Sequence, residues 1–185
     1  MEGKLEIICD HNSWLYDKYE NYRSFNCEKE ELNDFLCKYS RVEFKKKNKT
    51  IMLAVIGEKI VGFIAYSIDQ IGASFSDEEG IPHIKIEGFA VDKAYRGNGY
   101  GQMLMLEVIK NAYEIERMVC LQGIYLTSYK EAVDYYINKF SFEVINKYAM
   151  YNNDPDIVIP MRLDIGAIQD IVHAVKSKVT YTLKK

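Results

Sequence analysis

Cysteine and proline are scarce in this chain of 185 residues, which has four cysteines and three prolines. The cysteines are scattered without CxxC spacing, which argues against a zinc ribbon and a disulfide framework and suits a reducing cytoplasm. The sequence also lacks any run of about 18 consecutive apolar residues, so we expect no membrane span. Residues 1–10 show no basic segment followed by a long apolar run, and they predict no secretory signal.

Neither sign of charge dominates. The chain has 24 Lys and Arg against 27 Asp and Glu, a net charge of −3. This balance excludes a wholesale basic surface and leaves a local basic patch open. Hydrophobic residues make up 48% and charged residues 28%, which is ordinary globular usage and argues against disorder and fibrous repeats. A chain of this length buries about 70% of its unfolded surface, so we expect one soluble, intracellular domain.

The spacing of apolar residues predicts an alternation of helices and strands. Leu32, Phe35, Leu36 and Tyr39 recur at helical spacing and predict a helix over 28–43. Two β-branched runs at 50–56 and 60–69, separated by a glycine turn, predict a hairpin. The other expected elements are a polar loop at 71–83, strands at 84–91, 122–127, 142–151 and 157–163, and helices at 102–113, 128–140 and 165–179, the second opened by a capping box at 128–131. This order indicates an α/β fold with a mixed sheet and helices on its faces.

The most informative segment is a glycine-rich turn at 91–101, between a predicted strand and a predicted helix. Such a turn exposes backbone N–H groups in a concave nest at the positive end of the helix dipole, which binds phosphate or pyrophosphate. Gly99 and Gly101 allow close approach of the backbone to a ligand, and Arg96 adds charge on the rim. A nucleoside-triphosphate loop would need Lys followed by Ser or Thr, and a dinucleotide GxGxxG is weak because Gln102 takes its third glycine position. The pattern that fits is RxxGxG, from Arg96 to Gly101.

This pattern resembles the pyrophosphate loop of the GCN5-related N-acetyltransferase (GNAT) family, whose members use acetyl-coenzyme A (acetyl-CoA). The resemblance continues in the family's order over roughly 50–163. Residues 61–66 and 86–92 look like the strands before the loop, and 132–142 look like the helix and strand after it. It implies a GNAT fold, with a mixed central sheet of about six to seven strands flanked by helices on both faces. It also implies a GNAT domain at 1–164, with 165–185 as a C-terminal helical extension.

The resemblance implies a site for acetyl-CoA. In the family the strand before the loop separates from its neighbour, here expected at 122–127, and the pantetheine arm lies in the gap. A backbone N–H there would polarise the thioester for direct transfer to an amine. The implied cofactor-binding residues are Phe89, Ala90, Val91, Arg96, Gly97, Asn98, Gly99, Tyr100 and Gly101.

Tyr136 is our candidate general acid for the coenzyme A sulfur. Helical spacing places it on an inward face with Val133, Ile137 and Phe140. The alternative is a core tyrosine, in a chain with 15 tyrosines. The family usually has Gly four residues after this tyrosine, whereas here Ser141 follows after five.

Glu87 is the candidate base, directly or through water, because alternation places it on one strand face with Phe89 and Val91. The equal alternative is a carboxylate that orients the substrate or pairs with a lysine. We expect His83 to be solvated and Cys120 to be a small buried residue rather than a nucleophile. No metal-ligand cluster is visible in the sequence.

The acceptor is the part that these residues leave open. Phe25 to Leu36 follows the pattern Phe-x-Cys-x4-Leu-x2-Phe-Leu and, with Pro82, resembles the start of GNAT-type toxins of bacterial toxin–antitoxin pairs. This resemblance implies an aminoacyl-tRNA acceptor and a ribbon-helix-helix antitoxin as partner. The lysines at 45–49 could then meet phosphates or form a solvated helix end. The acidic residues at 77–79 could attract a cation or belong to a solvated loop.

We therefore predict an acetyl-CoA-dependent N-acetyltransferase that acts directly on a primary amine of a small molecule or protein. One alternative is a toxin-like enzyme that acetylates aminoacyl-tRNA. The other is a non-catalytic acyl-CoA-binding module, which the altered spacing after Tyr136 would fit. A homodimer also stays open.

Overall fold

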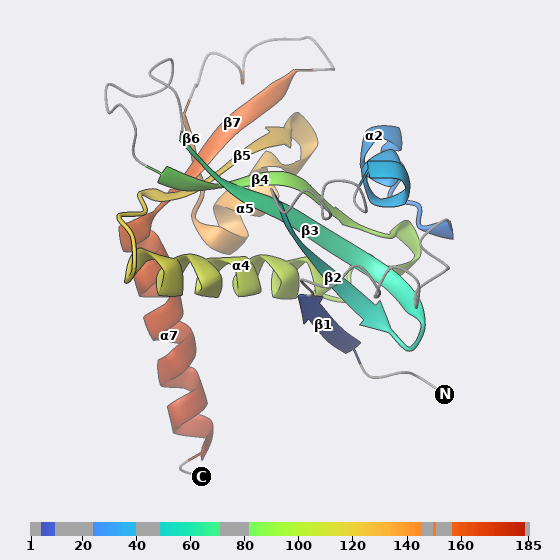
Figure 1. Cartoon of the computed structure of the whole chain (residues 1–185). Helices are drawn as coiled ribbons and strands as arrows, with labels where there is room; N and C mark the ends of the chain where they lie inside the picture. The colour runs from blue at the N-terminus through green and yellow to red at the C-terminus, as the bar shows by residue number, and fades with distance from the viewer. Residues whose placement is uncertain are drawn as a thin grey trace. The chain divides into compact units, whose positions relative to one another are not determined.

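The computed structural model describes residues 5–9, 24–39, 49–70, 82–145, 150 and 157–183. In these residues seven strands form one mixed sheet in the order β1-β2-β3-β4-β5-β7-β6 (Figure 1). The strands are β1 (Leu5–Cys9), β2 (Thr50–Ile56), β3 (Lys59–Gln70), β4 (Pro82–Val91), β5 (Gly123–Tyr129), β6 (Glu143–Val144) and β7 (Val158–Asp164). The helices are α2 (Glu30–Asp34), α4 (Tyr100–Glu116), α5 (Val133–Phe140) and α7 (Ile165–Leu183), with a π-helix η2 (Phe35–Tyr39) and 3₁₀ turns η3 (Lys93–Tyr95) and η4 (Lys130–Ala132). The predicted α/β class is confirmed.

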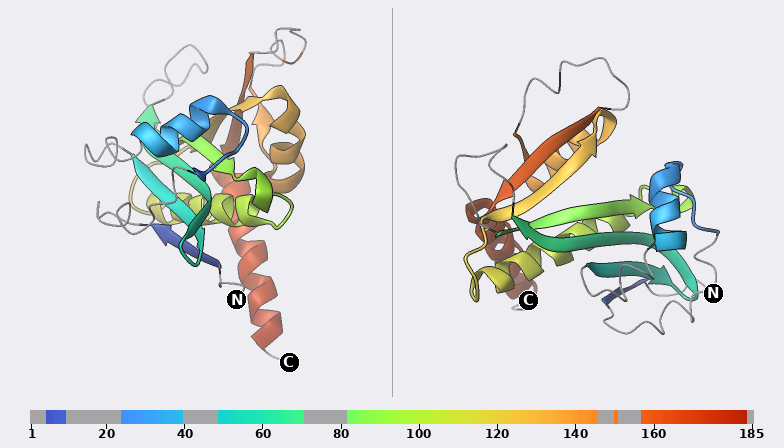
Figure 2. Two further views of the ribbon diagram at one scale, coloured as in Figure 1. Left: turned by 90° about the vertical axis from the view of Figure 1, so that its right-hand side faces the viewer. Right: turned by 45° about the horizontal axis from the view of Figure 1, so that its top comes forward.

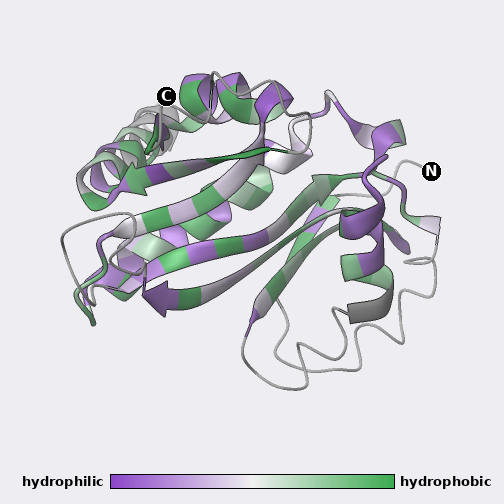
Figure 3. Ribbon diagram, turned by 90° about the horizontal axis from the view of Figure 1, so that it is seen from above, coloured by the Kyte–Doolittle hydropathy of each residue, from purple (hydrophilic) through white to green (hydrophobic). Residues whose placement is uncertain are grey.

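The chain divides into two compact units, of which the first comprises Met1–Ser67 and Ile86–Glu107. Strand β1 pairs antiparallel with β2, with Leu5 opposite Ile56. Strand β2 pairs antiparallel with β3, with Thr50 opposite Tyr66. Gly57 turns the β2–β3 hairpin at φ +61°, a left-handed conformation that glycine adopts without a Cβ clash. Residues 51–55 of β2 are all buried, as in a strand that is covered on both faces. Apolar bands recur along the strands in Figure 3.

Phe63 of β3 is central to the core of the first unit and is fully buried. Phe25 meets its ring edge to face, with centroids 5.6 Å apart, and Phe35 stacks on it at 5.8 Å. Gly88 of β4 makes room for this cluster, because a Cβ there would lie 3.2 Å from the Phe63 ring and 3.5 Å from that of Phe35. The core also contains Cys27, Leu36, Ile51, Leu53, Val55, Ile60, Ala65 and Ala90. The segment that leads into α2 is therefore anchored on β3 and β4.

The second unit comprises Ile68–Lys85 and Val108–Lys185. Its longest ladder joins β5 to β7 in antiparallel fashion from Gly123 with Asp164 to Tyr129 with Val158, and Figure 2 shows the two strands side by side. The short β6 pairs with the far edge of β7. A parallel ladder pairs the start of β4 with the start of β5, from His83 with Gly123 to Lys85 with Tyr125. Helix α7 contributes Ile168 and Val172 to the core of this unit.

Most predicted elements are confirmed with shifted ends, and one helix differs in kind. The helix expected at 28–43 is α2 followed by the π-helix η2, and 40–43 lie outside the described residues. Strand β1 was not predicted. The expected strand at 142–151 is described only at Glu143–Val144, while 146–149 and 151 lie outside the described residues. The lysines at 45–47 and the acidic residues at 77–79 also lie outside them.

The predicted capping box at 128–131 is wrong. Ser128 belongs to β5, which keeps pairing with β7 as far as Tyr129, and the Ser128 hydroxyl donates to the Tyr129 carbonyl. The chain then makes the 3₁₀ turn η4 before α5 begins at Val133, and neither start has a side-chain cap. Sheet pairing has taken the residues that local capping chemistry would otherwise use.

Candidate active site

The glycine-rich turn connects β4 to α4 inside the first unit. Gly97 and Gly99 have φ of +81° and +79°, values that residues with a Cβ rarely adopt. A Cβ at either glycine would meet no atom of the described residues within 4 Å, so packing against these residues does not require glycine there. The left-handed backbone does require it, and among the described residues the space beside both glycines is open.

The start of α4 supplies the hydrogen-bond donors of this turn. Its first bond runs from the Met103 N–H to the Gly99 carbonyl at 3.0 Å. The N–H groups of residues 100–102 therefore have no acceptor inside the helix and point out of its positive end. The Asn98 side chain donates to the Tyr95 carbonyl at 3.0 Å and fixes the turn from within. Outward-pointing N–H groups at the positive end of a helix are the features that anion sites use.

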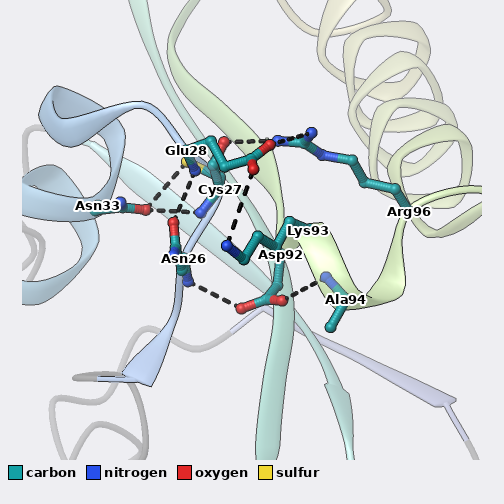
Figure 4. Close-up of polar contacts among 8 residues, drawn as sticks. All are labelled: Asn26, Cys27, Glu28, Asn33, Asp92, Lys93, Ala94 and Arg96. Atoms are coloured by element: carbon teal, nitrogen blue, oxygen red, sulfur yellow. Dashed lines mark hydrogen bonds and ion pairs between the residues drawn. The ribbon is translucent and has the colours of Figure 1, made fainter.

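Three successive backbone N–H groups fix the segment before α2, and the first of them ties it to the turn (Figure 4). The Asn26 N–H donates to the Asp92 carboxylate, the Cys27 N–H to the Asn33 side chain and the Glu28 N–H to the Asn26 side chain, each at 2.9 Å. The other Asp92 oxygen accepts from the Ala94 N–H at 2.9 Å, which caps η3. Side-chain oxygens thus specify the path of three consecutive residues.

Arg96 contributes to the same fastening. Its guanidinium donates to the Cys27 carbonyl at 2.6 Å and to the Glu28 carboxylate at 2.9 Å. The sequence predicted Arg96 as a charge on the rim of an anion site, and it did not predict these two partners. They lie 69 and 68 positions away in the chain, where no local pattern indicates them.

The exposed face of β4 carries the candidate base. Glu87, Phe89 and Val91 are partly exposed and the residues between them are buried, as the alternation predicts. The Glu87 carboxylate accepts from the Ser67 hydroxyl at 3.0 Å and lies 3.9 Å from the Lys49 ammonium. The pairing with a lysine, one of the predicted alternatives, is therefore present. The role of Glu87 as a base or as a group that orients the substrate stays a proposal.

Tyr136 lies in α5, in the second unit, and its side chain is buried as the helical spacing predicts. Its ring packs edge to face on Tyr135 at 5.5 Å and on Phe142 at 5.7 Å. Burial, and secondarily the neighbouring Tyr135 hydroxyl, raises the pKa of Tyr136 well above its ordinary value. The hydroxyl therefore holds its proton throughout the physiological range, as a general acid must. Ile137, predicted on the same face, is 40% exposed because the buried stripe is narrow and takes only positions 133, 136 and 140.

Ser141 takes the place expected for glycine after α5. It has φ +62°, and its N–H closes the helix on the Ile137 carbonyl at 3.0 Å. The next N–H, of Phe142, reaches the Tyr136 carbonyl at 3.3 Å. The helix therefore ends in a left-handed C-cap of the kind that glycine usually forms.

With this geometry in view, the comparisons with known proteins decide the family. A model of the acetyltransferase (GNAT) family matches residues 11–142, well over half of the chain. The chain belongs to the GNAT acetyltransferase family. It is an acetyltransferase, and its acyl donor is acetyl-CoA. No curated protein sequence matches the chain.

Solved structures support the GNAT fold over nearly the whole chain. A structure described as a bacterial toxin has a TM-score of 0.80 at 14% identity, covering 92% of this chain and 96% of its own. A mutant of the KacT toxin has a TM-score of 0.74 at 17% identity, covering 91% and 99%. The AtaT toxin complexed with acetyl-methionyl-tRNAfMet has a TM-score of 0.73 at 13% identity, again covering 91% and 99%. At these identities the likeness establishes the fold.

Two sequence expectations about this GNAT chain are wrong. His83 is 2% exposed rather than solvated, because β4 begins at Pro82 and pairs His83 with Gly123 of β5. Cys120 is exposed rather than buried, because it follows the exposed turn at 117–119 that ends α4. Among the described residues no group of His, Cys, Asp or Glu could hold a metal ion. No described helix is long and apolar enough to cross a membrane.

The sequence missed four residues that shape the candidate site, namely Asn26, Asn33, Ser67 and Asp92. Asn26 and Asn33 flank the start of α2, where Asx side chains commonly accept backbone N–H groups, so this signal was present. The buried Cys27 also belongs to this framework, and its thiol contacts the Asn33 side-chain oxygen at 3.1 Å. Burial raises the pKa of the Cys27 thiol, which keeps it protonated and unsuited to covalent catalysis.

Proposed function

We propose that this GNAT enzyme transfers the acetyl group of acetyl-CoA to the amino group of an aminoacyl-tRNA. The observation that carries the proposal is the extent of the structural likeness to toxins. It covers 91–92% of this chain and 96–99% of theirs in the structures compared, one of which contains acetyl-methionyl-tRNAfMet. The framework from Phe25 to Leu36, packed on β3 and β4, is the part of the chain whose pattern resembles that subgroup.

The glycine-rich turn fits the pyrophosphate of acetyl-CoA, because its two left-handed glycines leave open space beside outward-pointing N–H groups. We assign the binding of acetyl-CoA to Phe89, Ala90 and Val91 of β4 and to Arg96, Gly97, Asn98, Gly99, Tyr100 and Gly101 of the turn. In support, the parallel ladder of β4 with β5 ends at Lys85, before the three assigned residues of β4. When bound, acetyl-CoA supplies an activated thioester as acyl donor.

The chain's own residues would perform the remaining chemistry. A backbone N–H of the assigned β4 residues polarises the thioester carbonyl. Glu87 holds the incoming ammonium and accepts its proton, directly or through water, since a carboxylate partly exposed beside β3 can do both. Tyr136, kept protonated by burial, donates a proton to the leaving thiolate. Much of the rate enhancement then comes from positioning, which can contribute about 7–11 kcal/mol.

The same resemblance supports proposals about partners and organisation. A solved structure of a mutant AtaT toxin bound to the C-terminus of the antitoxin AtaR, 15% identical to this chain, has a TM-score of 0.74, and we propose a ribbon-helix-helix antitoxin as partner here. We assign 1–164 to the catalytic GNAT domain and 165–185, which contains all of α7, to a C-terminal extension. Acetyl-CoA and charged tRNA are both cytoplasmic, so we place the enzyme there. A homodimer is the oligomeric state to test first by light scattering.

The acceptor is tested with acetyl-labelled acetyl-CoA. Wild-type protein is incubated with a charged tRNA mixture, with the same tRNA after deacylation, and with free amino acids, polyamines and lysine peptides. The proposal predicts label that precipitates with charged tRNA and is released by mild base, and none with deacylated tRNA. Label only on a small amine or a lysine peptide would contradict the aminoacyl-tRNA proposal and favour the broader amine acceptor predicted from the sequence.

A further inference from the structure

Glu28 places a carboxylate between two cations at the edge of the glycine-rich turn. It lies 2.9 Å from the Arg96 guanidinium and 3.9 Å from the Lys93 ammonium. All three side chains are about half exposed, at 54%, 51% and 51%. Figure 4 shows Glu28 reaching from the segment before α2 towards both of them.

Stability does not account for an acidic residue at this position. Ion pairs between exposed side chains contribute little to folding. The Glu28 backbone has φ +63°, a left-handed conformation in which a residue with a Cβ is strained and glycine is not. Strain kept at a binding site points to a role for the side chain, and the contacts of this side chain are with Arg96 and Lys93.

The charges define that role. Lys93 and Arg96 would give the turn two positive charges for a pyrophosphate, and Glu28 cancels one of them. The carboxylate also occupies one edge of the Arg96 guanidinium, where an N–H donor would otherwise be available to a phosphate oxygen. A pyrophosphate in the turn must therefore compete with Glu28 for the same cations and is repelled by it.

We propose that Glu28 tunes the release of coenzyme A by competing with its pyrophosphate for Arg96 and Lys93. This rests on the proposed function, which places the pyrophosphate in the turn. The donor acetyl-CoA and the product coenzyme A carry the same pyrophosphate, so a tighter hold on it stabilises both alike and does not speed the chemical step. A tighter hold does slow the departure of product, which limits turnover in many enzymes. Glu28 thus keeps the affinity of the turn for coenzyme A moderate.

The test is calorimetric titration of Glu28→Gln with three ligands: acetyl-CoA, coenzyme A, and S-acetylpantetheine, which lacks the pyrophosphate. Both coenzyme A ligands should bind about three- to tenfold tighter than to wild type, the size expected for removing one nearby charge. S-acetylpantetheine should bind unchanged. Glu30→Gln is the matched control, since it removes an equal charge from the exposed first turn of α2 and should alter no affinity.

Two further variants make the result specific. Glu28→Gly removes the carboxylate and relieves the left-handed strain, so it should show the same tightening with no loss of thermal stability. In an Arg96→Gln background, Glu28→Gln should have a much smaller effect, because its main partner is gone. Stopped-flow displacement should show that coenzyme A leaves Glu28→Gln more slowly by the factor found at equilibrium.

The outcomes separate this inference from the proposed function. If Gly99→Ala binds acetyl-CoA as well as wild type, the pyrophosphate is not in the turn, and both the assignment of the cofactor site and the tuning role of Glu28 are overturned. If Gly99→Ala loses binding while Glu28→Gln binds with unchanged or weaker affinity, the site stands and the tuning role of Glu28 is overturned. Equal tightening of S-acetylpantetheine would also overturn it, because the effect would not depend on the pyrophosphate.

Discussion

The Asp92 carboxylate accepts a hydrogen bond from the Asn26 backbone N–H at 2.9 Å, across 66 positions of the chain. In return the Lys93 N–H donates to the Asn26 carbonyl at 2.9 Å. These bonds join the segment before α2 to the turn that we assign to acetyl-CoA. The glycine-rich turn and the segment that resembles the toxin subgroup therefore form one hydrogen-bonded framework within the first unit.

Replacing Asp92 should destabilise this framework. Asp92 is 8% exposed, and Asp92→Ala leaves the N–H groups of Asn26 and Ala94 without their acceptor. We expect the free energy of unfolding to fall by about 2–4 kcal/mol. Asp134→Ala, at the exposed first turn of α5, should cost about 0.5 kcal/mol. Urea unfolding of both variants provides the comparison, and equal losses would show that the bonds of Asp92 have no special weight.

Removing the Tyr136 hydroxyl should impair the chemical step. Tyr136→Phe keeps the ring packing on Tyr135 and Phe142 and deletes only the proton donor. We expect turnover to fall by about 10²-fold or more, with acetyl-CoA affinity unchanged. Tyr135→Phe is the matched control on the neighbouring position and should retain near wild-type turnover. A wild-type rate for Tyr136→Phe would eliminate Tyr136 as the acid.

The pH dependence of this step follows from the direction of the Tyr136 shift. Because burial raises its pKa above the ordinary value of about 10, the acid stays protonated and imposes no decline of turnover below about pH 10. The raised pKa of Tyr136 also affects stability. Its contribution to the folded state is fully present below the tyrosine pKa of the unfolded chain, about 10, and is lost at higher pH because the unfolded chain ionises first. Urea titrations at pH 9 and above should therefore show a steeper loss of stability in wild type than in Tyr136→Phe. Parallel losses would contradict this.

Glu87 is tested through the acceptor. Glu87→Gln can neither take a proton nor hold an ammonium ion, so we expect kcat/KM for the amine to fall at least about 10-fold, while the KM for acetyl-CoA stays the same. Asp69→Asn is the matched control, because Asp69 also pairs with a lysine, Lys85 at 3.7 Å. An equal loss in both variants would show that Glu87 acts only through surface charge.

Ser141 offers a prediction about stability alone. Because it stands at φ +62°, Ser141→Gly should relieve left-handed strain and raise the free energy of unfolding by up to about 1 kcal/mol. Asn138→Gly, in the exposed interior of α5, should lower it by a similar amount through lost helix propensity. Thermal unfolding measures both. A lower melting temperature for Ser141→Gly would contradict the C-cap assignment.

The sequence predicted what local backbone chemistry determines. The turn from Arg96 to Gly101, the hairpin at Gly57 and the inward face of Tyr136 all depend on residues within one or two turns of each other. The partners of Arg96 and Asp92 could not be predicted in this way, because Cys27, Glu28 and Asn26 reach them only when the chain folds back. His83 was misjudged for the same reason, since its burial depends on pairing with Gly123 of β5. Sheet pairing likewise overrode the local capping signal at Ser128.

The central claim, that the glycine-rich turn holds the pyrophosphate of acetyl-CoA, is tested most directly by a paired glycine titration. Gly99 and Gly57 both have left-handed backbones, and at each a Cβ would meet no atom of the described residues within 4 Å, so alanine imposes the same kind of strain at both. Calorimetry should show that Gly99→Ala loses acetyl-CoA binding while Gly57→Ala binds as wild type does. Undiminished binding by Gly99→Ala, or equal losses in both variants, would contradict the account.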